Sequence, residues 1–293
     1  MRILIVSNRL PFSLKNNDAG YQFSASSGGL VSGLSAYLDN LMSQQGGAPS
    51  SDNGKPVTYL WVGWPGITVE ETQQESVRSE AHTRFNACPV FLPEEAMDKF
   101  YHGFCNSTIW PLFHYFPSYA SYETSHWDSY QRVNEAFRDA IVPHVRPGDV
   151  IWIHDYHLML LPRLLRAHFP DTPIGFFLHI PFPCFELFRL LPRQWSRSII
   201  EGLYGADVVG FHTNDYAQYF LRSALRLMGD DNFLGRILTH DRVIKVGTFP
   251  MGIDFERFSE AAEDPLSLEG LGRIASGDTP PKIILSVDRL DYS

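Results

Sequence analysis

Three residues with chemically useful side chains each stand at the end of a short apolar run: Arg9, Asp155 and His179. An arginine offers a planar fork of N–H donors that binds phosphate in bidentate fashion. A carboxylate accepts hydrogen bonds from sugar hydroxyls, or acts as a base when its pKa is tuned. The histidine is followed by Pro181 and Pro183, and prolines after a strand freeze a turn and hold the ring in place. On the residues alone, a phosphate group and sugar hydroxyls are therefore the ligand groups that these side chains could bind.

Each of these residues also has a purely structural interpretation. Arg9 is equally consistent with an ordinary surface arginine, and a lone histidine is more often structural than functional. His154 and His157 flank Asp155 and invite a metal interpretation, but metal sites need three or four converging ligands. No second cluster of His, Cys or Asp is evident, and no Asp-x-Asp pair is present to hold a metal-bound nucleotide diphosphate. We therefore expect no metal.

A pair of glycines, Gly28 and Gly29, precedes the helical pattern Leu30–Leu41. Glycines before a helix let a diphosphate approach backbone N–H groups at the positive end of the helix dipole. The pattern is not G-x-G-x-x-G, and a Ser-Ser-Gly-Gly turn is often only a loop with a helix cap. Both interpretations stay open on this run alone.

The elements that position these residues are short runs that are apolar at consecutive positions, which is typical of buried parallel strands. The expected strands are Ile3–Ser7, Tyr59–Val62, Val150–His154, Ile174–His179, Val208–His212 and Val243–Phe249. The helical patterns between them are Leu30–Leu41, Tyr130–His144, Leu158–His168, Ser196–Tyr204 and Asp215–Leu227, the last with Asn214 as its expected cap. This alternation predicts an α/β fold with a doubly wound, Rossmann-like parallel sheet. In such sheets ligands bind beyond the carboxyl ends of the strands, where the crossover direction reverses.

The expected domain organisation has three parts. Residues 1–250 form a Rossmann-like domain, with a polar insertion at about 43–55 that is rich in Gly, Ser, Asn and Pro. Residues 251–281 form a connection. Residues 282–293 begin a second domain, because Ile283–Val287 is typical of a first strand that is then cut short. The alternative is a last edge strand of a single domain.

Composition excludes several classes of protein. The 293 residues carry 24 Lys plus Arg against 33 Asp plus Glu, a formal charge of −9, which argues against nucleic acid as a partner. No stretch approaches the ~20 apolar residues of a membrane span. The cysteines, an odd number without metal-type spacing, are typical of reduced thiols in a cytoplasmic protein: Cys88, Cys105 and Cys184.

Aromatic residues are dense between Trp61 and Trp127. Sugar rings present apolar C–H faces to aromatic rings and hydroxyls to polar neighbours. Most of these aromatics belong to the core, and spacing alone does not choose the subset that lines a site.

Eight motifs resemble, in order along the chain, those of trehalose-6-phosphate synthases. They lie at residues 7–9, 27–30, 61–64, 110–115, 152–158, 175–183, 210–213 and 286–293. Several are long and unusual, and together they span almost the whole chain. The first eleven residues and the polar insertion are most similar to fungal members.

The resemblance implies the N-terminal, acceptor-binding domain of a two-domain, retaining GT-B glycosyltransferase of trehalose biosynthesis. Such enzymes transfer glucose from UDP-glucose, a co-substrate, to glucose 6-phosphate, giving trehalose 6-phosphate and UDP. They need no metal or other cofactor, and transfer is thought to occur on one face without a protein nucleophile. Around glucose 6-phosphate the resemblance places Arg9, Trp61, Tyr101, Trp110 and Asp155. Towards UDP-glucose it places Gly28, Gly29, His179 and Arg289, and it gives Asp155 and His179 the catalytic positions.

In the family pattern, the motif at Arg289–Ser293 is followed by a lysine that binds the donor diphosphate and then by the donor domain. We therefore expect the chain alone to bind glucose 6-phosphate weakly and not to turn over. One alternative is another GT-B glycosyltransferase with a different acceptor. A second is a non-catalytic regulatory subunit of a trehalose synthase complex, and assembly into a homo-oligomer also remains open. A dinucleotide-binding module is disfavoured by the lack of G-x-G-x-x-G.

Overall fold

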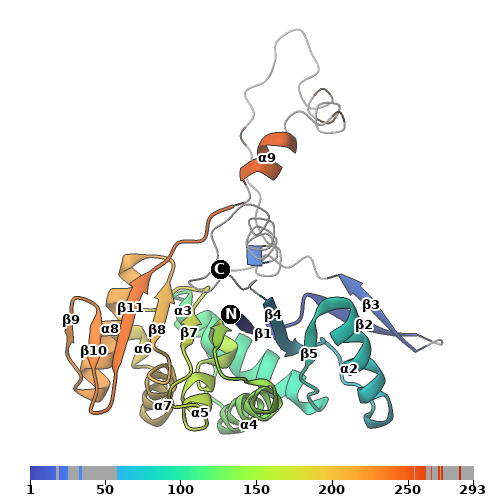
Figure 1. Cartoon of the computed structure of the whole chain (residues 1–293). Coiled ribbons are helices and arrows are strands. Elements are labelled where there is room, and N and C mark those ends of the chain that lie inside the picture. Colours follow the sequence, from blue (N-terminus) through green and yellow to red (C-terminus); the bar gives the residue numbers. More distant parts are fainter. Residues whose placement is uncertain are drawn as a thin grey trace.

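Six apolar runs of the sequence form parallel strands of one large sheet (Figure 1). They are β1 (Arg2–Arg9), β4 (Thr58–Trp64), β6 (Asp149–His154), β7 (Ile174–Phe177), β8 (Val208–Phe211) and β11 (Val243–Thr248). The computed structural model describes residues 1–17, 20–25, 33–34, 58–253 and 255–261, and the single positions 265, 270, 272 and 284. Burial is continuous from Ile3 to Asn8 in β1, as expected for a strand covered on both faces.

Within the described residues the sheet has nine strands in the order β5-β4-β1-β6-β7-β8-β11-β10-β9. The additional strands are β5 (Ala87–Pro89), which is parallel to β4, and the antiparallel pair β9 (Asn232–Phe233) and β10 (Arg236–Leu238). From β1 the chain passes outward to β4 and β5 and then returns to β6 on the other side of β1. The crossover direction therefore reverses between β1 and β6, whose register pairs Ile5 with Trp152. This is the position at which doubly wound sheets bind ligands.

Helices cover the sheet on both faces. Ile5 and Trp61 pack in one buried cluster with Val77 and Ala81 of α2 (Glu71–Phe85). Leu4, on the opposite side of β1, belongs to a larger cluster that also contains buried residues of the remaining long helical segments. These are η2 (Met97–Ile109, π-helical), α4 (Thr124–Ile141), α5 (Leu161–Arg166), α7 (Arg193–Leu203) and α8 (Asn214–Met228). The predicted doubly wound α/β fold is confirmed.

Several elements differ from the sequence prediction. The long loop expected after Arg9 contains a hairpin, β2 (Phe12–Asn17) and β3 (Gly20–Ala25), and α2 and η2 were not predicted. The cap of α8 is Thr213, whose hydroxyl accepts from the backbone N–H of Tyr216, and not Asn214. Shorter segments are α3 (Trp110–Phe113), η3 (Pro117–Tyr119), η4 (Val142–His144), η5 (Tyr156–Leu158), α6 (Phe185–Phe188) and α9 (Phe255–Ala261). The polar insertion lies outside the described residues, as do most of the helix at 30–41 and of the strand at 283–287.

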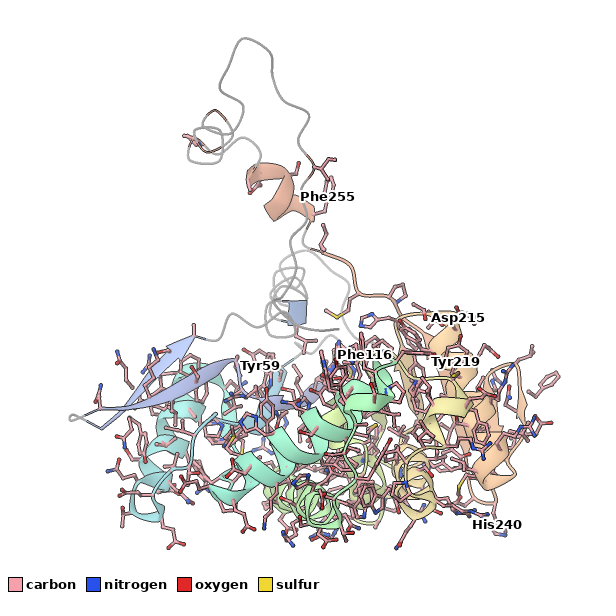
Figure 2. All side chains as sticks on the ribbon, turned by 180° about the vertical axis from the view of Figure 1, so that it is seen from behind. Tyr59, Phe116, Asp215, Tyr219, His240 and Phe255 are labelled. Atoms are coloured by element: carbon pink, nitrogen blue, oxygen red, sulfur yellow. The ribbon has the colours of Figure 1, made fainter. Side chains whose placement is uncertain are left out.

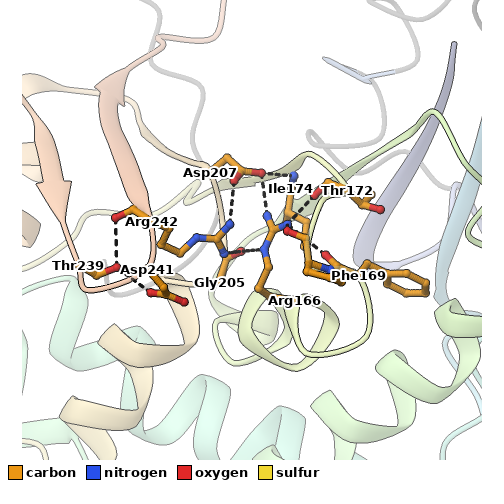
Figure 3. A network of polar contacts seen from close by, with 10 residues as sticks. Arg166, Phe169, Thr172, Ile174, Gly205, Asp207, Thr239, Asp241 and Arg242 are labelled. Atoms are coloured by element: carbon orange, nitrogen blue, oxygen red, sulfur yellow. Dashed lines mark hydrogen bonds and ion pairs between the residues drawn. The ribbon is translucent and has the colours of Figure 1, made fainter.

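A network of two arginines and one aspartate joins the amino ends of three strands (Figure 3). Asp207, just before β8, accepts from Nη2 of Arg166 at 2.7 Å and from Nη2 of Arg242 at 3.1 Å. Its Oδ2 also accepts from the backbone N–H of Ile174 at the start of β7, at 2.8 Å. Arg166 donates further to the carbonyl oxygen of Gly205. The network therefore ties α5 to the starts of β7, β8 and β11.

Candidate active site at the carboxyl end of the sheet

The candidate site lies where the carboxyl ends of β1 and β6 meet. Arg9 is the last residue of β1 and His154 is the last residue of β6. In Figure 2, Asp215, just beyond β8, lies at the upper edge of the sheet region, whereas His240, just before β11, lies at the lower edge. Phe116 lies on the same side as Asp215. Because β1, β6, β7 and β8 are parallel, the predicted site residues at their carboxyl ends lie towards the same edge of the sheet as the end of β8.

Arg9 lies over an aromatic surface. Its guanidinium carbon is 4.5 Å from the ring centroid of Trp64 and 5.9 Å from that of Tyr101. Gly66, with φ +97°, leaves the space for it, because a Cβ there would lie 2.0 Å from Nη1 of Arg9. Arg9 is an exposed residue, yet desolvation still lowers the pKa of its guanidinium, which Tyr101 partly offsets. The arginine stays a cation and remains open to an anionic ligand.

Tyr101 rests on a buried, neutral histidine. The rings of Tyr101 and His157 are stacked at 5.9 Å with an interplanar angle of 8°. Burial, with a smaller contribution from the charge of Arg9, lowers the pKa of His157 to about 3. Its Nδ1 lies 4.0 Å from Oδ2 of Asp155, but a neutral imidazole forms no ion pair at that distance. His157 thus supports the wall beneath Arg9 without adding charge.

Asp155 has a strained backbone. Its φ of 76° and ψ of 167° fall in a region that is essentially restricted to glycine. Its backbone N–H donates to the carbonyl oxygen of Phe177 at 2.8 Å, and its Oδ1 accepts from the backbone N–H of His179 at 3.2 Å. The carboxylate is thereby held at the ends of β6 and β7, one strand away from Arg9.

His179 is half-buried in a row of imidazoles that crosses three strand ends. Its Nε2 lies 3.0 Å from Nδ1 of His154, and its ring centroid lies 5.6 Å from that of His212. Burial first and then His212 lower the pKa of His179 to about 4. Burial also lowers the pKa of His154 and of His212. All three rings are therefore neutral near pH 7.

The two predicted tryptophans lie in different places. Trp110, at the start of α3, has its ring 5.8 Å from that of Tyr156 and 4.0 Å from that of His114, so it lies beside the segment that carries Asp155. Trp61 is 1% exposed, and its Nε1–H donates to Oγ of Ser7 at 2.8 Å. It packs in the cluster that contains α2, on the opposite face from Trp64.

A contact between Trp61 and the acceptor stays a prediction, and the buried ring of Trp61 lies on the other face of β4 from Arg9. The structure puts Trp64, not Trp61, under the guanidinium of Arg9. The physical reason is the alternation of a strand, in which residues three apart point to opposite faces. Gly28, Gly29 and Arg289 lie outside the described residues, and their roles stay predictions.

Three residues of the site were missed from the sequence: Trp64, Gly66 and His157. Strand alternation was a usable signal for Trp64, since only one of the two tryptophans in β4 can share the face of Tyr101. The glycine after Pro65 is a turn signal, but its contact with Arg9 is tertiary. Nothing local indicates that His157 stacks on Tyr101.

Two further findings concern metals and membranes. Among the described residues, no group of three or more His, Cys, Asp or Glu side chains is arranged to hold a metal ion. Within the same part of the chain, no helix has both the length and the apolar character needed to cross a bilayer. Cys88, Cys105 and Cys184 form no disulfide with one another.

Comparisons with known proteins agree with this fold. The UDP-forming α,α-trehalose-phosphate synthase of Schizosaccharomyces pombe is 41% identical over 296 residues, covering 99% of this chain and 54% of that protein. The N-terminal domain of Candida albicans trehalose-6-phosphate phosphatase matches with a TM-score of 0.73 at 31% identity, covering 94% of this chain and 55% of that one. A Burkholderia xenovorans α,α-trehalose-phosphate synthase in complex with glucose 6-phosphate matches with a TM-score of 0.70 at 26% identity, covering 94% and 56%.

The fold and the matched structures define a GT-B glycosyltransferase domain. A family model described as glycosyltransferase family 20 matches residues 1–293, and the chain belongs to that family. The chain spans about half the length of the S. pombe relative.

Proposed function

We propose that this chain forms the acceptor-binding half of a UDP-forming α,α-trehalose-phosphate synthase. The enzyme transfers glucose from UDP-glucose to glucose 6-phosphate with retention of configuration, giving trehalose 6-phosphate and UDP. The observation that carries the proposal is the guanidinium of Arg9, which lies over Trp64 at the point where the sheet reverses direction. The S. pombe relative bears this name, and the matched B. xenovorans structure contains glucose 6-phosphate.

The described residues take distinct parts in the proposed transfer. Arg9 binds the 6-phosphate, because its planar fork of donors matches a phosphate. Asp155 accepts hydrogen bonds from acceptor hydroxyls, and His179 lies beside the donor glucose. Negative charge develops on the leaving UDP, and we assign its stabilisation to Arg289 and to backbone N–H groups near Gly29. We assign no protein nucleophile. Retaining glycosidases that form a covalent intermediate use two carboxylates about 5 Å apart, one of which is the nucleophile. The proposed transfer takes place on one face of the sugar and differs from that mechanism.

Titration calorimetry with glucose 6-phosphate tests the acceptor site. We expect Arg9→Ala to weaken binding by about 1.5–3 kcal/mol, because it removes a charged hydrogen-bond donor. Arg84→Ala is the matched control: Arg84 also lies over an aromatic ring, that of Phe85, at 5.2 Å, but outside the site. Glucose, which lacks the phosphate group, is the ligand control. Equal affinity for glucose and glucose 6-phosphate, or unchanged affinity in Arg9→Ala, would remove Arg9 from the proposed site.

A second candidate is a non-catalytic subunit of a trehalose synthase complex. The similarity to the N-terminal domain of the C. albicans phosphatase favours it. A subunit without acceptor binding would show no heat with glucose 6-phosphate, whereas the proposed synthase half binds it. Light scattering of the purified chain, alone and with candidate subunits, measures homo-oligomer and complex formation.

The proposal includes no metal and no resident cofactor. A phosphate bound by arginine needs no bridging cation, and the transfer has no redox step. We expect EDTA to leave glucose 6-phosphate binding unchanged, and a loss of affinity that Mg²⁺ restores would contradict this.

A cytoplasmic location is also proposed, because free cysteines are typical of a reducing compartment.

A further inference from the structure

His154 is fully buried and lies behind the predicted catalytic histidine. Its Nδ1 is 3.0 Å from Nε2 of His179, and its other face packs against Trp152 at 4.5 Å between ring centroids. We propose that His154 is a positioning residue: it donates a hydrogen bond from Nδ1 to Nε2 of His179 and so fixes the proton of His179 on Nδ1. This inference rests on the proposed function in one respect only, which is that the donor sugar is taken as the group that His179 faces.

Counting protons on the two rings leads to this assignment. Both rings are neutral near pH 7, because burial lowers both pKa values, so each ring carries one N–H. In one arrangement, Nδ1 of His154 carries the proton and donates to Nε2 of His179, and Nε2 of His154 is unprotonated. In the other, His179 donates from Nε2 and His154 carries its proton on its own Nε2.

The surroundings of Nε2 of His154 decide between the two arrangements. That atom is buried and has no hydrogen-bond partner among the described residues. Among buried backbone groups, an N–H without an acceptor is rarer than an acceptor that is not fully paired, and we apply the same preference to this imidazole. The arrangement that leaves a lone pair at this position is therefore favoured, and it puts the shared proton on Nδ1 of His154.

The consequence for His179 is a defined chemical character. With Nε2 accepting from His154, the proton of His179 sits on Nδ1. That nitrogen makes no hydrogen bond within the described residues and is not among their buried, unpaired atoms, so it is the ring nitrogen that we assign to the donor sugar. The backbone N–H of His179 is already held by Asp155. His179 therefore presents a neutral N–H donor to an oxygen of the donor sugar and does not act as a base.

Nitrogen-15 NMR of the histidine-labelled chain tests the assignment without any ligand. Long-range proton–nitrogen correlations distinguish a ring nitrogen that carries a proton from one that does not. We expect both His154 and His179 to carry the proton on Nδ1, with Nε2 of His179 shifted by accepting a hydrogen bond. Exposed His240 serves as the reference for a ring that exchanges freely between tautomers. A proton on Nε2 of His179, or averaged signals like those of His240, would overturn the proposal.

Two variants separate the hydrogen bond from the volume of the side chain. In His154→Asn the amide N–H stands close to the position of Nδ1, and we expect His179 to keep its tautomer. In His154→Leu the donor is absent, and we expect the ratio of Nδ1–H to Nε2–H in His179 to fall at least tenfold. An unchanged ratio in the leucine variant contradicts the proposal. Should that variant fail to fold, the wild-type spectrum alone decides. Because no substrate is present, failure here is separate from failure of the synthase assignment.

Discussion

The carboxylate of Asp155 holds the backbone of His179: its Oδ1 accepts the N–H of that residue at 3.2 Å. The two residues follow neighbouring strands, β6 and β7, and the bond ties the acceptor side of the site to the donor side. Asp155 makes this contact from a backbone conformation normally found only in glycine. At this position a strained backbone therefore coincides with a side-chain carboxylate that holds the backbone of His179.

Replacement of Asp155 by glycine and by alanine separates these two contributions. Both variants lose the carboxylate, and we expect both to lose glucose 6-phosphate binding. In regular structure alanine is more stable than glycine by about 0.5–1 kcal/mol. Here we expect the reverse order, with Asp155→Gly more stable than Asp155→Ala by about 1–3 kcal/mol, because only glycine relieves the strain. Urea denaturation measures the difference, and equal midpoints would show that the backbone is not strained.

Gly66 keeps Arg9 in place, and adding a methyl group should displace the guanidinium. We expect Gly66→Ala to weaken glucose 6-phosphate binding about tenfold, the equivalent of about 1.4 kcal/mol. Gly229→Ala is the matched control, because Gly229 has a similar φ of +85° but nothing within 4 Å of an added Cβ. Backbone strain is thus common to both variants, and only Gly66→Ala crowds Arg9. Equal binding by the two variants would argue against the contact.

Trp61 and Trp64 should respond differently to replacement by phenylalanine. Trp61→Phe removes a buried hydrogen bond to Ser7, and we expect it to lower the free energy of unfolding by about 1–3 kcal/mol while leaving binding unchanged. Trp64→Phe replaces the ring that cations prefer with a weaker one, and we expect weaker glucose 6-phosphate binding. Calorimetry and urea denaturation of both variants check this. A loss of binding in Trp61→Phe with no loss in Trp64→Phe would favour Trp61 over Trp64 as the aromatic residue beside the acceptor.

Acid should destabilise the fold through its buried histidines. In the unfolded chain a histidine titrates near 6.5, whereas in the folded chain the pKa of His157 is about 3 and that of His179 is about 4. Between these values the unfolded chain binds more protons, so stability falls as the pH drops below about 6.5, by up to about 1.4 kcal/mol per pH unit for each histidine. Urea denaturation from pH 8 to pH 4 measures this dependence.

The variants for this pH dependence are His157→Phe and His240→Gln. Phenylalanine removes one buried titrating group, so we expect a shallower decline of stability between pH 6.5 and pH 4. His240 is exposed, and its variant is the control for replacing a histidine outside the core. A slope that is the same in His157→Phe and in the wild type would mean that His157 is protonated in the folded chain.

Much of the fold was predictable because parallel strands buried on both faces leave a continuous apolar run. The run Ile3–Ser7 is such a case, and it lies in β1, an interior strand of the sheet. Helix α2 was not predicted, since only Val77 and Ala81 of its residues are buried and no apolar stripe marks it. The hairpin after Arg9 was missed because its strands alternate only weakly between buried and exposed positions.

The candidate site was predictable only in part. Strand ends and the reversal of the crossover direction indicate that Arg9, Asp155 and His179 share one side of the sheet. Which aromatic ring lies under Arg9 depends on the face of β4, and the bond from His154 depends on the spacing of neighbouring strands. The positive φ of Asp155 has no signal in the sequence, because an aspartate there looks like any other residue after a strand.

The shared carboxylate of Asp207 has a mechanical consequence for the other end of the sheet. Since β7, β8 and β11 are anchored at their starts through one ion-pair network, they are restrained from sliding past one another. We therefore expect any adjustment to a ligand in this half of the molecule to occur in the segments that follow the strands, and not in the strands themselves.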